Sequence, residues 1–198
     1  NIGGIVNITS LDNKERMSGT DIGPGMCLID SWIRKKTKKN YDENGILARS
    51  GNIDKKILKE MIENFYEKEK TFKKGPIKSF DTKFFDFSYI KDMNLEDGTA
   101  TLTEFTAQII ISTLKLRKKY KEEIVLCGGG RKNIFLVEKL KKENNKIKLI
   151  DDYGIDGDFI ESQAFAYLAI RSFLKLPLTF PETTGVSEPS SGGIIIKN

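Results

Sequence analysis

The sequence contains no histidine among its 198 residues. This absence excludes a Ser-His-Asp triad, a Cys-His pair and any histidine-ligated metal formed by this chain alone. Acid–base chemistry would therefore depend on Asp, Glu, Lys or Tyr side chains. The two cysteines, Cys27 and Cys127, fit neither a disulfide framework nor a zinc motif, and each adjoins an apolar run. We expect two buried free thiols.

Long apolar runs and low-complexity linkers are also missing. No stretch is long enough to span a membrane and none resembles a secretory signal, so the sequence predicts a cytoplasmic protein with no membrane partner. The formal net charge is +5, carried mostly by lysine, whereas phosphate-binding surfaces favour the bidentate arginine fork. We therefore expect a solvated surface and no nucleic-acid partner. Nucleic-acid binding remains an alternative function, suggested only by basic runs such as residues 117–119.

The periodicity of the apolar residues predicts a layered α/β domain with no internal division. Strands are expected over 2–9, 16–21, 124–127 and 147–150, and helices over 28–36, 54–66, 101–120, 133–142 and 158–174. The segments 101–104 and 158–161 match the capping-box pattern, so they predict the starts of two of these helices.

One carboxylate, Asp21, lies between a predicted strand and the Gly-Pro-Gly turn at 23–25. Glycine lets a backbone or a ligand approach closely, so a carboxylate held there can act as a general base. An Asx turn, in which Asp21 accepts from a nearby backbone N–H, explains the same position equally well. Asp30, inside the next helix, is interpreted as structural.

Two further glycine clusters, Gly3-Gly4 and residues 128–130, follow apolar segments. Glycines after a strand can hold a phosphate or a ribose close to the backbone, which favours a nucleotide or sugar cleft. A β-bulge and a plain strand–helix turn are the alternatives. The spacing matches neither a P-loop nor a dinucleotide fingerprint.

An ordered series of short motifs runs along nearly the whole chain. They are Asn-Ile-Gly-Gly-Ile-Val-Asn-Ile-Thr at 1–9, Gly-Thr-Asp-Ile-Gly-Pro-Gly at 19–25, Leu-Ile-Asp-Ser-Trp at 28–32, Tyr41-Asp42 with Gly45, Ala-Thr-Leu-Thr-Glu at 100–104, Cys-Gly-Gly-Gly at 127–130 with Asn133, Gly-Ile-Asp at 154–156, Glu161 with Ala-Phe-Ala at 164–166, and Thr184-Gly185. The series resembles the C-terminal half of anhydro-N-acetylmuramic acid kinases.

The resemblance implies a ribonuclease-H-like lobe of the sugar-kinase, heat-shock-protein and actin superfamily, with a mixed sheet flanked by helices. Residues 1–198 would form the single C-terminal lobe of a two-lobe kinase. The first lobe of the family carries a Gly-Thr-Ser-Met-Asp-Gly phosphate loop, which this sequence does not contain. The implied partners are that first lobe and a second copy in a homodimer.

The implied reaction opens the 1,6-anhydro bond of anhydro-N-acetylmuramic acid with water and phosphorylates O6 with ATP, during peptidoglycan recycling. By motif position Asp21 is the catalytic base, and Gly23 and Glu161 contact the sugar. Nucleotide-binding residues are Asn1, Gly3, Gly4, Gly128, Gly129 and Gly130. No metal ligand is predicted in this chain, and Mg²⁺ would be held largely by the first lobe.

Departures from the family pattern favour a second hypothesis. Residues 75–81 keep Lys78 and Ser79 but lack the usual Thr-Gly-Arg, and Met26 replaces an asparagine. A non-catalytic remnant that binds nucleotide, sugar or a partner is therefore the alternative, and the isolated chain is expected to be inactive. Glu161 also fits a capping box with Asp158 as N-cap.

Overall fold

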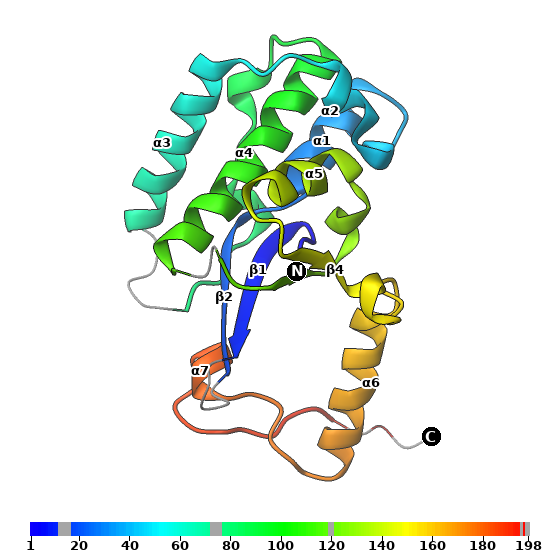
Figure 1. Cartoon of the computed structure of the whole chain (residues 1–198). Helices are drawn as coiled ribbons and strands as arrows, with labels where there is room; N and C mark the ends of the chain where they lie inside the picture. Colours follow the sequence, from blue (N-terminus) through cyan, green and yellow to red (C-terminus); the bar gives the residue numbers. More distant parts are fainter. Residues whose placement is uncertain (12–16, 72–76, 119–120, 195, 197–198) are drawn as a thin grey trace.

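The computed structural model describes residues 1–11, 17–71, 77–118, 121–194 and 196. Helices form a bundle above a long β-hairpin, and the last long helix descends opposite this hairpin (Figure 1). The predicted α/β class is confirmed.

The described strands form two separate ladders instead of the expected mixed sheet. β1 (Ile5–Leu11) pairs antiparallel with β2 (Met17–Pro24), and β3 (Ile124–Leu126) pairs parallel with β4 (Ile147–Leu149). The predicted hairpin is thus confirmed, and its turn at 12–16 lies outside the described residues. Ile2 links the ladders, because its N–H donates to the Cys127 carbonyl at 2.8 Å and its carbonyl accepts from the Gly130 N–H at 2.7 Å.

The long helix α4 (Leu95–Leu116) lies at the centre of the molecule and is buried on two sides. One side, with Ile110 and Leu114, packs with the strands and with α5 (Ile134–Glu143), whereas Leu102 and Phe105 pack with α1 (Cys27–Lys36) and α3 (Lys55–Thr71). The predicted capping box at 101–104 is wrong. The helix begins six residues earlier, where the Asn94 side chain accepts from the Asp97 N–H.

A short helix, α2 (Ile46–Ser50), lies between α1 and α3, where the sequence analysis expects neither a helix nor a strand. The two carboxylate oxygens of Asp42 accept from the backbone N–H groups of Leu47 and Ala48, both at 2.9 Å. These bonds satisfy donors that have no partner inside the first turn, so a single buried carboxylate stabilises the helix.

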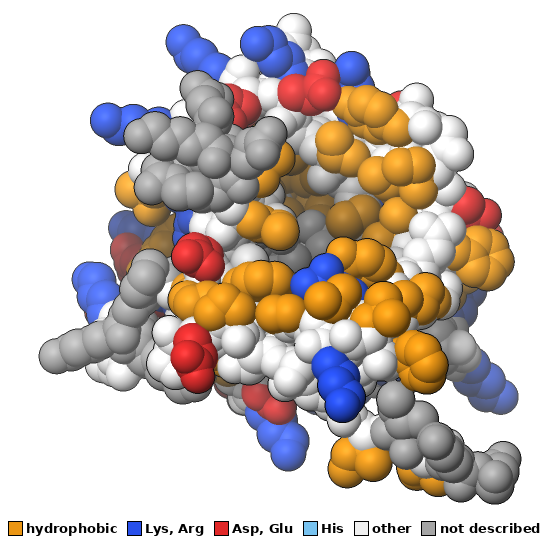
Figure 2. Space-filling view, turned by 90° about the horizontal axis from the view of Figure 1, so that it is seen from below, with side chains coloured by type: hydrophobic (Ala, Val, Ile, Leu, Met, Phe, Trp, Pro, Cys, Tyr) orange, Lys and Arg blue, Asp and Glu red, His pale blue; other side chains and the backbone are white. Residues whose placement is uncertain are grey.

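The last long helix, α6 (Ile160–Phe173), has no buried residue. Its predicted capping box is wrong, since Phe159 is the N-cap and the Asp158 side chain instead binds Arg131 and Lys132. Hydrophobic side chains gather on the face seen from below, around a hollow, and basic side-chain atoms interrupt them (Figure 2). The large apolar residues of α6 that are more than half exposed are Phe165, Tyr167, Ile170 and Phe173.

Candidate functional site

A large cavity lies between the β1–β2 hairpin and the C-terminal segments that carry α6 and α7 (Pro181–Thr184). Its volume is about 720 Å³, which is within the usual range for small-molecule sites. We call it the Asp21 cavity. Its lining includes Thr20, Asp21, Lys78, Tyr167 and Arg171.

Asp21 is half-buried on the wall of this cavity. Its Oδ2 accepts from the Phe80 N–H at 2.8 Å, and its own N–H donates to the Lys78 carbonyl at 3.0 Å. The local Asx turn is therefore not formed, because the bonded N–H belongs to a residue 59 positions away. These bonds fix a carboxylate at the cavity, as a general base requires.

The segment around Lys78 lies along β2 and supports Asp21. The Thr20 hydroxyl accepts from the Lys78 N–H at 2.7 Å. The Lys78 ammonium group binds the Glu69 carboxylate of α3. The part of the chain that departs most from the family pattern therefore lies directly beside the candidate base; Gly75 and Pro76 of that segment are outside the described residues.

The glycine clusters meet at a second cavity of about 460 Å³, which we call the glycine cavity. Gly3 and Gly4 line it from the N-terminal segment, and Gly129 and Gly130 line it from the β3–α5 connection. The carbonyls of Gly3 and Gly4 accept from the N–H groups of Met26 and Gly25, at 2.8 and 2.9 Å. The clusters predicted to bind nucleotide are thus brought together.

The close packing of this region explains most of its glycines. A Cβ on Gly25 would overlap the Gly3 carbonyl oxygen, and a Cβ on Gly130 would overlap the Ile2 side chain. Gly128 has a φ of +82°, which favours glycine. Gly129 differs, since a Cβ there would meet no atom within 4 Å. It is therefore the glycine of this cluster whose absent side chain leaves space for a ligand.

Two polar atoms that lack partners belong to residues lining the glycine cavity. Asp30 Oδ1 and Asn133 Nδ2 are buried and make no hydrogen bond to a described residue. The other side-chain atom of Asn133, Oδ1, accepts from the Leu136 N–H at 3.0 Å and caps α5. Burial raises the pKa of the Asp30 carboxyl to about 6; Arg34 opposes this shift and Asp42 adds to it. A buried polar atom without a partner costs free energy, which a ligand can recover.

Arg131 connects the glycine cluster to the start of α6, a role that the sequence analysis missed. Its buried guanidinium donates from Nε and Nη2 to Asp151, at 2.7 and 3.1 Å, and from Nη2 to Asp158 at 2.9 Å. Its Nη1 donates to the Gly128 carbonyl at 3.3 Å. The hydrogen bonds to Asp151, with those to Asp158, hold the pKa of the guanidinium above its ordinary value. The only sequence signal was an arginine directly after three glycines.

Three predicted site residues lie elsewhere. Gly23 is buried and does not line the Asp21 cavity, and a Cβ there would lie 2.6 Å from Ile109 Cγ2. Glu161 is exposed on the first turn of α6 and is not among the residues lining the Asp21 cavity. Asn1 lies near Gly128 but lines a neighbouring cavity between β1 and β3. The roles predicted for these residues stay predictions.

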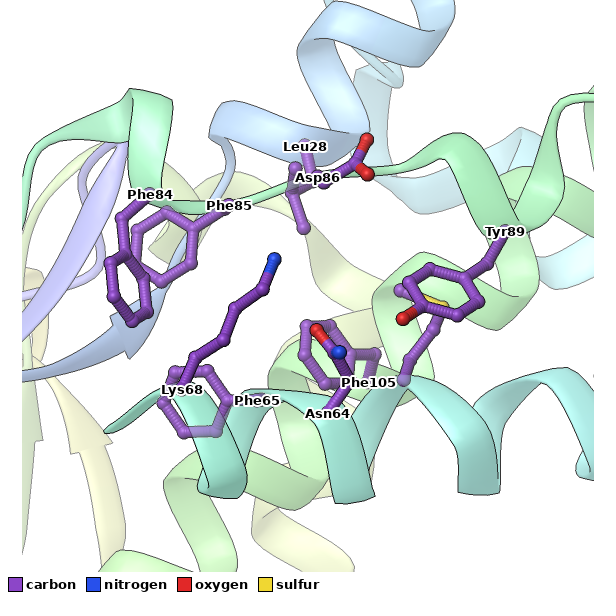
Figure 3. A pocket seen from close by; sticks show the side chains of 10 residues that line it. Leu28, Asn64, Phe65, Lys68, Phe84, Phe85, Asp86, Tyr89 and Phe105 are labelled. Carbon is purple, nitrogen blue, oxygen red and sulfur yellow. The ribbon is translucent and has the colours of Figure 1, made fainter. Parts of the chain in front are cut away.

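The aromatic segment 80–89 surrounds a third cavity, against α3 (Figure 3). Lys68, Phe85 and Tyr89 lie around it, but its volume is about 20 Å³, close to that of one water molecule. The aromatic rings therefore pack against one another as part of a core. Within the described ranges, no three Asp, Glu or Cys side chains gather to hold a metal ion, and no helix has the length and apolarity to cross a membrane.

The comparisons with known proteins all point to one family. The family model "Anhydro-N-acetylmuramic acid kinase" matches residues 1–198. Proteins of that name from Pelagibacter ubique and Zymomonas mobilis are 47% and 36% identical, over 100% and 98% of this chain and 54% and 53% of their own lengths. The relative from Agrobacterium fabrum is 34% identical over 100% of the chain and 52% of its own length. The chain spans about half the length of these curated relatives, and it belongs to the anhydro-N-acetylmuramic acid kinase family.

Proposed function

We propose that this chain provides the sugar pocket and the adenosine side of the nucleotide cleft of an anhydro-N-acetylmuramic acid kinase. The observation that carries the proposal is Asp21, a carboxylate fixed by the Phe80 N–H on the wall of a cavity of about 720 Å³. The meeting of the glycine clusters at a separate cavity supports the nucleotide part.

In the proposed reaction, the Asp21 carboxylate takes a proton from a water molecule. The water oxygen forms a bond to the anomeric carbon of the sugar, and the bond from that carbon to O6 breaks. O6 receives the γ-phosphoryl group of ATP, and ADP leaves. A carboxylate suits this step, because it removes a proton without itself needing to attack the acetal. The product, N-acetylmuramate 6-phosphate, would enter peptidoglycan recycling.

The proposal treats residues 1–198 as the second, ribonuclease-H-like lobe of a two-lobe kinase. The length of the curated relatives, about twice that of this chain, is consistent with such a partner lobe. Phosphoryl transfer needs charge stabilisation around the whole triphosphate, so the first lobe would supply the remaining contacts. Mg²⁺ would be held largely by the first lobe, together with the phosphates of ATP.

A non-catalytic binding module is the second candidate. The observation in its favour is that the segment beside Asp21 lacks the usual Thr-Gly-Arg and that its Lys78 ammonium is already paired with Glu69. Such a module would keep both cavities and bind its ligands, but it would not convert the sugar to a product.

The test is the substitution Asp21→Asn in a protein that carries both lobes. Sugar-dependent ATP consumption should fall by about a hundredfold or more, because a general base is lost, while ADP binding stays unchanged. Asp92→Asn, at an exposed position that does not line the cavity, is the matched control. Wild-type turnover by Asp21→Asn would refute the assignment of the base, and an inactive wild type that binds both ligands would favour the binding module.

A further inference from the structure

The Asp21 cavity also contains a cation on the wall opposite its carboxylate. Both residues line the cavity: Asp21 belongs to β2 and Arg171 to the last turn of α6, the helix that lies opposite the hairpin (Figure 1). Among the described residues that line the cavity, two carry cationic side chains, Lys78 and Arg171.

The two cations differ in their surroundings. The Lys78 ammonium is paired with the Glu69 carboxylate. The Arg171 guanidinium has neutral partners: Nε donates to the Pro177 carbonyl at 2.7 Å, and Nη1 donates to the Tyr167 hydroxyl at 3.1 Å. Its positive charge is therefore not compensated by a hydrogen-bonded carboxylate in the described part of the chain.

The two neutral bonds also fix the plane of the guanidinium. The Tyr167 ring lies beneath it, with 5.6 Å from the Arg171 Cζ to the ring centroid. The third nitrogen, Nη2, has no hydrogen-bond partner among the described residues, and the side chain is half-buried. A fixed, partly desolvated guanidinium with donors left over is suited to bind a carboxylate.

Resting on the function proposed above, we infer that Arg171 binds the lactyl carboxylate of anhydro-N-acetylmuramic acid and so makes the site specific for the acidic sugar. That carboxylate is ionised at neutral pH, since an unperturbed carboxyl has a pKa near 4. With the acid at Arg171, the anomeric end of the sugar faces the β2 wall, where Asp21 lies. Arg171 is thus a specificity-determining residue, and Asp21 performs the chemistry.

The experiment compares two ligands in the protein that carries both lobes: anhydro-N-acetylmuramic acid and 1,6-anhydro-N-acetylglucosamine, a neutral sugar without the lactyl group. Calorimetric titration should show that the wild type binds the acid at least about tenfold more tightly than the neutral sugar. Arg171→Gln should reduce this ratio to about one while the affinity for the neutral sugar stays within about twofold. Lys175→Gln, an exposed cation four positions further on, is the matched control and should keep the wild-type ratio.

Arg171→Lys provides a second variant that keeps the charge, should Arg171→Gln melt at a lower temperature. It loses the planar fork, so the ratio should fall several-fold and KM for the acid should rise while kcat stays unchanged. If the Arg171 variants lose affinity equally for both sugars, the inference is overturned, because Arg171 would then only hold the Pro177 carbonyl in place. A wild type that binds both sugars equally overturns the inference alone, whereas a wild type that binds neither sugar overturns the proposed function as well.

Discussion

Substituting Gly129 by valine separates ligand binding from folding in the glycine cavity. A Cβ at this position meets nothing within 4 Å, and Gly129 is not among the glycines with positive φ. Valine should therefore leave the free energy of unfolding within about 0.5 kcal/mol of wild type. Its three carbons would occupy the cavity of about 460 Å³ beside Gly130 and Asn133. The affinity for ADP should fall at least about tenfold, or about 1.4 kcal/mol.

The neighbouring Gly130→Val is the matched comparison. Its Cβ would overlap the side chain of Ile2, which is 1% exposed and links the two ladders. Overpacking of this kind costs about 1–3 kcal/mol, so Gly130→Val should melt at a clearly lower temperature. Thermal unfolding and an ADP titration followed by chemical-shift changes measure both properties. ADP binding by Gly129→Val at wild-type strength, with shifts away from residues 128–130, would refute the assignment of the nucleotide site.

Three further predictions concern stability and turnover. Gly23→Ala should lower the free energy of unfolding by about 1–3 kcal/mol in a denaturant titration, because the added methyl group would lie 2.6 Å from Ile109; unchanged stability would contradict the packing. Burial raises the Asp30 pKa from 3.8 to about 6, so the native state holds a proton that the unfolded chain loses in this interval, and wild-type stability falls as pH rises through it. The melting temperature of Asp30→Asn should therefore be higher than that of the wild type at pH 8, and the two should be equal below pH 3.8. Equal melting temperatures at pH 8 would contradict this prediction. The isolated chain should melt cooperatively yet show no sugar-dependent ATP consumption; clear turnover would contradict the two-lobe argument.

Elements with local signals were predictable from the sequence. Asn133 caps α5 at the predicted place, because an N-cap acts within three residues. The start of α4 was predicted wrongly, because the threonines at 101–104 match the capping-box pattern although they lie inside the helix. Inside the helix, the hydroxyls of Thr99 and Thr103 donate to the carbonyls four residues earlier. A buried threonine thereby satisfies its own hydroxyl, and local sequence does not separate the two arrangements.

The candidate site was predicted in its parts and not in its assembly. The glycine clusters and Asp21 were named from their motifs, but the Phe80 N–H that fixes Asp21 comes from 59 positions away. The pairing of Arg131 with Asp151 spans 20 positions. Such long-range bonds depend on how the elements pack, and periodicity or spacing carries no signal for them.

An isotope experiment tests the proposed function most directly. A protein carrying both lobes is incubated with anhydro-N-acetylmuramic acid and ATP in ¹⁸O-labelled water, and the sugar phosphate is analysed by mass spectrometry. Attack by an Asp21-activated water predicts a sugar 6-phosphate with ¹⁸O at the anomeric carbon, and its loss in Asp21→Asn. A phosphorylated product without ¹⁸O, or the same labelled product from Asp21→Asn, would contradict the role of this carboxylate.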